Sequence, residues 1–105
     1  MKPIVRRAKA DADVQAAVEH LLLNAPESAL PFTESLQQAY QHLQKCPNSG
    51  SPRYAHDLNL PGLEFWLCNG FPYLVFYVEL STRIEVWRIL HGHRDIPESL
   101  PAEQS

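Results

Sequence analysis

Five residues with ionisable side chains gather in one short stretch near the end of the sequence: Arg88, His91, His93, Arg94 and Asp95. Histidine exchanges protons near neutral pH, so His91 and His93 could act as general acids or bases. Arginine presents a planar fork of donors that suits carboxylates and phosphates. The stretch could therefore support proton transfer, phosphate stabilisation, metal binding or recognition of an acidic partner.

Metal binding is the weakest of these options. His91 and His93 are two residues apart at a strand end, so their side chains could point to one side and share a metal with a third ligand such as His56. A histidine pair at this spacing is a weak signal by itself, and we predict no metal site and no other cofactor. We expect His91 instead to brace the strand end, where Gly92 permits a bend.

The charge balance bears on nucleic-acid binding. The chain has 9 Lys and Arg residues against 12 Asp and Glu residues, which gives a net charge of −3. A protein that grips RNA or DNA along its phosphates normally carries a basic surplus. Direct nucleic-acid binding is therefore not expected, although folding could still gather the few arginines onto one face.

The length of 105 residues indicates one globular domain, which we place at residues 1–97, with 98–105 as a short tail. No apolar run reaches the roughly 20 residues that a membrane-spanning helix needs. The first residues are basic without a following apolar stretch, so no secretory signal is expected. Cys46 and Cys68 are then expected to be reduced thiols in a cytoplasmic protein.

Two helices are predicted after a short strand over residues 2–8. Asp11 or Asp13 is expected to cap the first helix, which Pro26 ends. The second helix is expected to begin near Pro26, with a local distortion at Pro31. Because the link between them is short, the two helices should form an antiparallel hairpin. The apolar stripe of the first helix consists of Val14, Ala17, Val18, Leu21 and Leu22. The second helix is expected to carry Phe32, Leu36, Ala39, Tyr40 and Leu43 on one face.

Beyond a loop that runs to Pro61–Gly62, the apolar period changes from about 3.6 to 2, which predicts strands over 63–68, 73–80 and 84–92. Asn69–Gly70 is a signal for a two-residue type I′ hairpin. We expect the three strands to form an antiparallel meander with the helix hairpin on one face. The predicted fold class is α+β.

The other face of this sheet is expected to stay uncovered, because so small a domain has no further element to place over it. Exposed apolar patches of that kind mark partner sites. Trp66 alternates with Phe65 and Leu67, so the two sets lie on opposite faces. Trp66 is therefore a candidate partner contact, since tryptophan is frequent among interface anchors.

The segment Arg88–Pro97 reads Arg-Ile-Leu-His-Gly-His-Arg-Asp-Ile-Pro and closely resembles the C-terminal signature of ParE-like toxins. In that signature a strand ending in Arg-x-Leu-His-Gly leads into x-Arg-Asp-aliphatic-Pro. The proline-rich loop Cys46–Arg53 and the strand Tyr73–Tyr77 are also similar to this family. The resemblance spans residues 2–97 and points to the ParE-like branch of the RelE/ParE superfamily. It implies an N-terminal strand, an antiparallel helix hairpin and a three-stranded meander.

The resemblance also implies a function, namely the toxin of a type II toxin–antitoxin system. Such a toxin would inhibit growth by binding DNA gyrase, and a helical ParD-like antitoxin would neutralise it. On this interpretation Arg88 and Arg94 lie at a rim that pairs with antitoxin carboxylates. The expected partner-binding residues are Trp66, Arg88, His91, His93, Arg94 and Asp95.

Two alternatives stay open. Members nearer the RelE pattern cut messenger RNA on the ribosome, and the Gly92-His93-Arg94 triplet is similar to that branch. Metal-free RNA cleavage needs a base, an acid and several cations, yet no tyrosine follows Tyr77 and the loop before the meander supplies no lysine. We therefore favour a toxin that is not an enzyme. The second alternative is a degenerate relative that assembles with its partner without being toxic.

Overall fold

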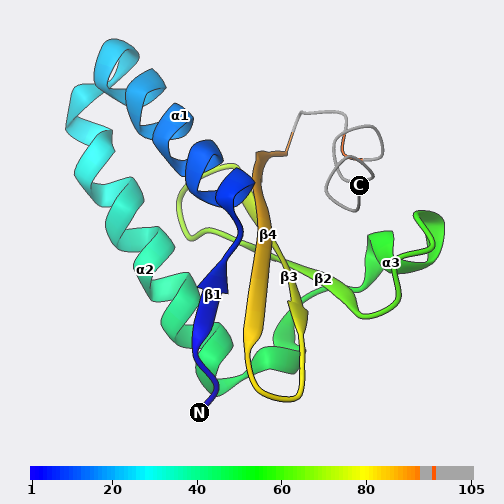
Figure 1. Cartoon of the computed structure of the whole chain (residues 1–105). Helices are drawn as coiled ribbons and strands as arrows, with labels where there is room; N and C mark the ends of the chain where they lie inside the picture. The colour runs from blue at the N-terminus through cyan, green and yellow to red at the C-terminus, as the bar shows by residue number, and fades with distance from the viewer. Residues whose placement is uncertain (93–95, 97–105) are drawn as a thin grey trace.

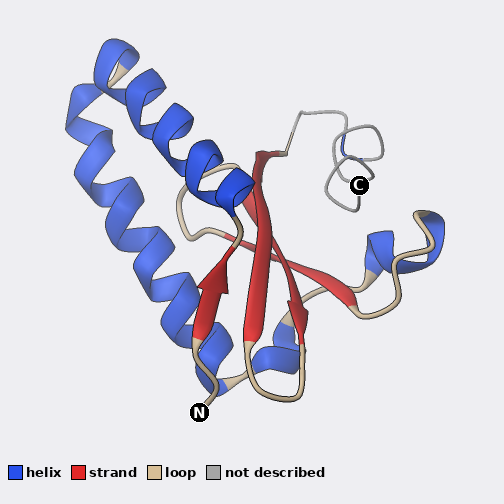
Figure 2. Cartoon of the chain, in the orientation of Figure 1, coloured by secondary structure: helices blue, strands red, loops and turns tan. Residues whose placement is uncertain are grey.

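The computed structural model describes residues 1–92 and residue 96. Figure 1 and Figure 2 show a sheet with two long helices on one side and a short helix near one sheet edge. The elements follow in the order β1 (Ile4–Arg6), α1 (Ala8–Asn24), η1 (Pro26–Ser28), α2 (Ala29–Lys45), η2 (Pro47–Ser49), α3 (Arg53–Asp57), β2 (Leu63–Leu67), β3 (Tyr73–Glu79) and β4 (Ile84–His91).

The four strands form one mixed sheet in the order β1–β4–β3–β2. β2, β3 and β4 are antiparallel neighbours, which confirms the predicted meander. β1 adds to it in parallel, with Ile4 opposite Ile84 and Arg6 opposite Val86. The antiparallel helices α1 and α2 cover one face (Figure 1). The predicted α+β fold is therefore correct.

Helix α1 begins earlier than the sequence suggested. Arg7 is its N-cap residue and makes no capping hydrogen bond with its side chain. Asp11 already lies in the first turn, where the helix dipole favours an acid, and its carboxylate accepts a hydrogen bond from Arg6 at 2.8 Å. Asp13 lies further along the helix. The prediction that Asp11 or Asp13 caps α1 is therefore wrong.

The second helix begins near Pro26, as predicted, but in two pieces. The 3-10 turn η1 comes first, and α2 starts at Ala29. Pro31 falls in the first turn of α2, where a missing backbone N–H leaves no helical hydrogen bond unmade. The irregularity therefore lies at the junction of η1 and α2, before Pro31. The predicted apolar face of α2 is confirmed as buried: Phe32, Leu36, Ala39, Tyr40 and Leu43.

The connection between β2 and β3 is longer than the predicted two-residue hairpin. Of its residues only Gly70 has a positive φ, at 81°, whereas a type I′ turn needs a positive φ at Asn69 as well. The N–H of Phe71 donates to the carbonyl of Cys68 at 3.3 Å, which closes a four-residue turn with glycine in third place. A positive φ at that position fits a type II turn.

The second face of the sheet is covered, contrary to expectation. Residues 53–60, which include the unpredicted helix α3, pack over it together with Ile96. Phe76 on this face is fully buried. A five-residue helix is too short to show a helical period in sequence, so residues 46–62 read as a loop. The apolar cluster of this face consists of Leu60, Leu63, Phe76, Val78, Leu90 and Ile96.

One buried hydroxyl fixes the loop between α2 and α3. The side chain of Tyr77 is fully buried, and its hydroxyl donates to the carbonyl of Pro47 at 2.7 Å. The same oxygen accepts the N–H of Gly50 at 3.1 Å. A Cβ atom on Gly50 would lie 2.3 Å from this oxygen. Glycine is therefore required at position 50 by the close approach of the tyrosine.

Candidate functional site

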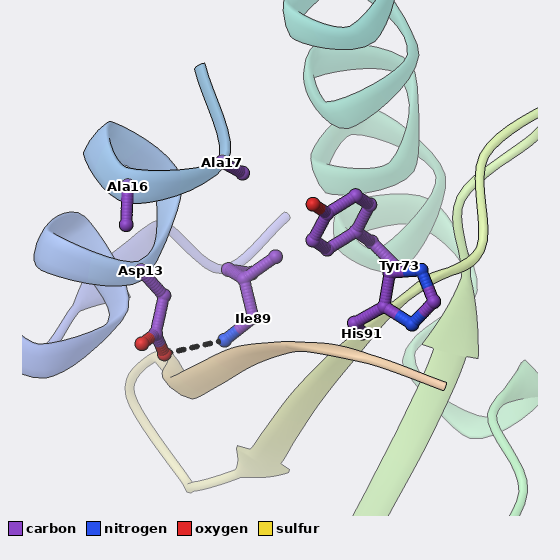
Figure 3. A pocket seen from close by; sticks show the side chains of 6 residues that line it. All are labelled: Asp13, Ala16, Ala17, Tyr73, Ile89 and His91. Atoms are coloured by element: carbon purple, nitrogen blue, oxygen red, sulfur yellow. Dashed lines mark hydrogen bonds between the residues drawn. The ribbon is translucent and has the colours of Figure 1, made fainter. Parts of the chain in front are cut away.

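Asp13 of α1 joins the helix hairpin to the last strand. Its carboxylate accepts two hydrogen bonds from the Arg88 guanidinium, at 2.7 and 2.9 Å, and one from the N–H of Ile89 at 3.0 Å. The Asp13 and Arg88 side chains are only 11% and 12% exposed. Both oxygens of the Asp13 carboxylate therefore accept hydrogen bonds from residues of β4, and Figure 3 shows the bond from Ile89.

The topology explains why a carboxylate lies here. β1 pairs with β4 only over Ile84–Val86, and its last backbone hydrogen bond runs from Arg7 to Val86. Beyond that point β4 continues while the chain from β1 has already turned into α1. The N–H of Ile89 would be left without a strand partner, and a buried unpaired N–H is costly. Asp13 supplies the missing acceptor.

This geometry changes the interpretation of Arg88. The sequence led us to expect its charge at a rim, paired with carboxylates of an antitoxin. In the structure its guanidinium is largely buried and holds a carboxylate of the same chain. Alternation along β4 showed that the Arg88 side chain must project from one face of the sheet. It could not show that the guanidinium would pair with Asp13, which is 75 residues away in sequence.

A hollow of about 180 Å³ lies beside this ion pair. The rings of Tyr73 and His91 are opposite one another on β3 and β4 and pack edge to face, with centroids 5.3 Å apart. Small side chains at Ala16 and Ala17 leave room on the helix side. Figure 3 shows the residues that line the hollow: Asp13, Ala16, Ala17, Tyr73, Ile89 and His91.

A second, more open depression of about 480 Å³ lies at the same end of β3 and β4. Its apolar wall includes Leu67, the side chain that alternation correctly placed on the face away from Trp66 and that is 56% exposed. His91, one of the predicted site residues, lines the first hollow. The next residue, Gly92, was not a predicted site residue and lines the second depression. The lining residues are Leu67, Cys68, Gly70, Phe71, Pro72 and Gly92.

Trp66 lies apart from both depressions. It is half-buried on the helix-covered face, where its ring stacks on His42 of α2 at 4.3 Å between centroids. Leu63 and Phe65 belong to the apolar cluster on the other face, and alternation along β2 places Leu67 on that face too. Alternation therefore separated the two sets correctly, but it could not say which one the helices cover. His93, Arg94 and Asp95 lie outside the described residues.

Several basic side chains are neutralised within the chain. Glu85 accepts hydrogen bonds from Arg83 at 2.6 Å and Arg7 at 3.1 Å, and the bond from Arg83 is the main cause of its lowered pKa. The Arg7 guanidinium also lies 4.3 Å from the centre of the Trp87 ring. Further ion pairs join Lys2 to Glu79, Arg6 to Asp11 and Arg88 to Asp13. Lys2, Arg6, Arg7, Arg83 and Arg88 are thus each paired with a carboxylate of the same chain.

Cys68 is a buried free cysteine. Burial raises the pKa of the Cys68 thiol to about 11, so this sulfur stays protonated near neutral pH. Over residues 1–92 and 96, no three His, Cys, Asp or Glu side chains are grouped as metal ligands. In the same part of the chain, no helix is both long and apolar enough to cross a membrane.

Sequence reasoning did not identify Asp13 and Tyr73 as residues that line the first hollow. Asp13 was considered only as a helix cap, and Tyr73 only as a strand residue. The adjacent alanines at 16 and 17 were a usable signal, because small residues on a helix that packs on a sheet leave space beside it. The partnership of Asp13 with Arg88 depends on long-range packing, and no local pattern encodes it.

Comparison with known proteins identifies the family. The family model described as the ParE toxin of the type II toxin–antitoxin system parDE matches residues 4–96. A solved structure of the chromosomal ParDE TA system from P. aeruginosa is similar, with a TM-score of 0.71 and 24% identity, over 87% of this chain and 96% of that one. No curated protein matches. The structural likeness supports the fold, and the family match spans nearly the whole chain. The chain therefore belongs to the ParE toxin family of type II toxin–antitoxin systems, in the RelE/ParE superfamily.

Proposed function

We propose that this chain is a growth-arresting toxin that acts on DNA gyrase in the cytoplasm and is neutralised by a ParD-like antitoxin. The observation that carries this proposal is the match of the ParE toxin family to residues 4–96. The similar solved structure bears the name of a ParDE toxin–antitoxin system, in agreement with a partner of that kind. A toxin that works by binding needs a surface and no catalytic set.

The antitoxin surface is proposed at the end of β4, because residues at this strand end line both depressions. His91 lines one and Gly92 the other. Apolar side chains of a bound helix would fill such depressions, with an exposed Leu67 as a contact on one side. His93, Arg94 and Asp95 follow directly in sequence, so we keep them as partner-binding residues. We also keep Trp66, as an outlying contact.

The ribonuclease alternative is disfavoured because three arginines of the described chain already bind carboxylates of the same chain. Stabilising a phosphorane requires cations that point at the reacting phosphate. Arg88, the arginine closest to His91 in the described strand, has its guanidinium held by Asp13, and Arg7 and Arg83 hold Glu85. These pairings support the proposal of a toxin that acts by binding and does not cut RNA.

We expect that inducing this chain alone in bacteria arrests growth, and that co-expression of the protein encoded in the adjacent reading frame restores it. Colony counts after induction measure the effect. Asp11→Ala is a matched control that should remain toxic, because it removes only an exposed ion pair. Normal growth with confirmed soluble protein would instead favour the degenerate, non-toxic relative.

A further inference from the structure

Three exposed leucines surround the turn of the helix hairpin. Leu22 and Leu23 lie in the last turn of α1 and are 55% and 85% exposed, and Leu30 in the first turn of α2 is 68% exposed. The sequence placed Leu22 in the apolar stripe of α1, yet the structure leaves it largely in solvent. Figure 1 shows this end of the hairpin projecting away from the sheet. Single exposed leucines are common, but three of them around one projecting turn indicate a surface for a partner.

The same end of the hairpin carries uncompensated negative charge. Residues 10–44 contain five Asp or Glu residues and no Lys or Arg residue. Asp11 and Asp13 are paired with Arg6 and Arg88. The other three acids are exposed and form no ion pair with any described residue: Glu19, Glu27 and Glu34.

Helical spacing places an acid beside a leucine on both helices. Glu19 comes four residues before Leu23 on α1, and Glu34 comes four residues after Leu30 on α2. Residues four apart are neighbours on the surface of a helix. Glu27 lies in the turn η1 between the two helices. The hairpin end, defined by these three leucines and three glutamates, therefore combines apolar area with a negative rim.

The charge of the hairpin end selects its partner. In a symmetric contact with a second copy, the same patch meets itself, so glutamates would face glutamates. The cytoplasmic surface of a membrane is negatively charged, and so is nucleic acid, and both would repel the hairpin end. A protein surface with basic residues around an apolar depression complements it.

We infer that the hairpin end contacts a cationic surface of the target, DNA gyrase. The inference rests on the proposed action on gyrase. Gyrase acts on DNA, and a protein that grips DNA along its phosphates carries a basic surplus. The surface proposed for the antitoxin lies elsewhere, because none of the three leucines lines either depression at the end of β4.

The double variant Leu23→Ala with Leu30→Ala tests the apolar part of the inference. Inhibition of supercoiling by purified gyrase should weaken about tenfold or more, because these side chains would no longer be buried at the interface. Stability in urea should stay near wild type, since both side chains are mostly in water in the free chain and alanine favours a helix. Affinity for the protein from the adjacent reading frame should not change.

Glu34→Lys tests the charge. Reversing one charge of the negative rim should slow association with gyrase about threefold or more at low salt, and the difference should shrink as salt is raised. Asp57→Lys is the matched control, because it reverses an exposed acid on α3, away from the hairpin, and should leave the rate near wild type. An unchanged rate for Glu34→Lys, or an equal loss in the control, would overturn the cationic partner.

The remaining outcomes separate this inference from the proposed function. Undiminished inhibition by the double leucine variant, while wild type inhibits gyrase, would overturn the inference and leave the proposed function intact. An equal loss of affinity for the antitoxin would assign the hairpin end to that partner and would also overturn it. If the wild-type chain leaves supercoiling unimpaired, the proposed function fails first, and the inference fails with it.

Discussion

Asp13→Ala is expected to lower the free energy of unfolding by about 3–5 kcal/mol, the range for breaking one side of a buried ion pair. The reason is that this carboxylate accepts hydrogen bonds both from the Arg88 guanidinium and from the backbone N–H of Ile89. Removing it leaves the Arg88 guanidinium, 12% exposed, without its carboxylate and the N–H of Ile89 without its acceptor. Urea titration of purified protein measures the change.

The control for this prediction is Asp11→Ala. Asp11 also pairs with an arginine on a neighbouring element, at 2.8 Å, but the two side chains are 49% and 56% exposed. Exposed pairs contribute about 0–1 kcal/mol, so this variant should remain close to wild type. Equal losses for the two variants would contradict the assignment of the Asp13–Arg88 pair as a buried structural bridge.

The same geometry affects how substitutions at Arg88 are read. Arg88→Glu would place a carboxylate against Asp13 in a site from which solvent is mostly excluded. We expect loss of folding from such like-charge burial. A weaker antitoxin complex in that variant would therefore report stability and not a direct contact.

Gly50→Ala is expected to destabilise the fold by about 1–3 kcal/mol, the range for overpacking a buried site. The new Cβ would lie 2.3 Å from the Tyr77 hydroxyl and 3.0 Å from the Phe65 carbonyl oxygen. Tyr77 cannot withdraw easily, because its ring is fully buried and its hydroxyl is bonded to Pro47. Urea unfolding again measures the loss.

Two comparisons isolate the clash. Gly92→Ala should cost little, since the nearest atom to its Cβ would be the Pro72 carbonyl oxygen at an ordinary 3.6 Å. In a Tyr77→Phe background the cost of Gly50→Ala should shrink, because the clashing oxygen is gone. The same cost in both backgrounds would show that the hydroxyl is not what requires glycine.

Much of the fold could be predicted from local sequence. Helical spacing found the buried face of α2 from Phe32 to Leu43, and the change to period 2 found the meander. The failures concern boundaries and short elements. The three-residue strand β1 determines where α1 begins, so the predicted N-cap of α1 was placed too late in the sequence. Helix α3 is too short for a helical period to appear.

The candidate site was harder to predict, for a physical reason. The motif at residues 88–97 pointed to the correct family and to the end of β4, where His91 lines a hollow. Which side chains meet there depends on packing between α1 and the sheet. Asp13 and Arg88 are 75 residues apart, and no periodicity connects them. Tyr40 was predicted to lie in the core, but only the structure showed that its hydroxyl has no hydrogen-bond partner within the described residues.

The most direct test of the proposed function is gyrase activity in the presence of the purified chain. Supercoiling of relaxed plasmid by gyrase is followed as the protein is titrated, with and without the protein from the adjacent reading frame. We predict that supercoiling is lost with the chain alone and restored when the antitoxin is added in equal amount. Unimpaired supercoiling at a large excess of folded protein, together with cleavage of messenger RNA on translating ribosomes, would contradict the proposal.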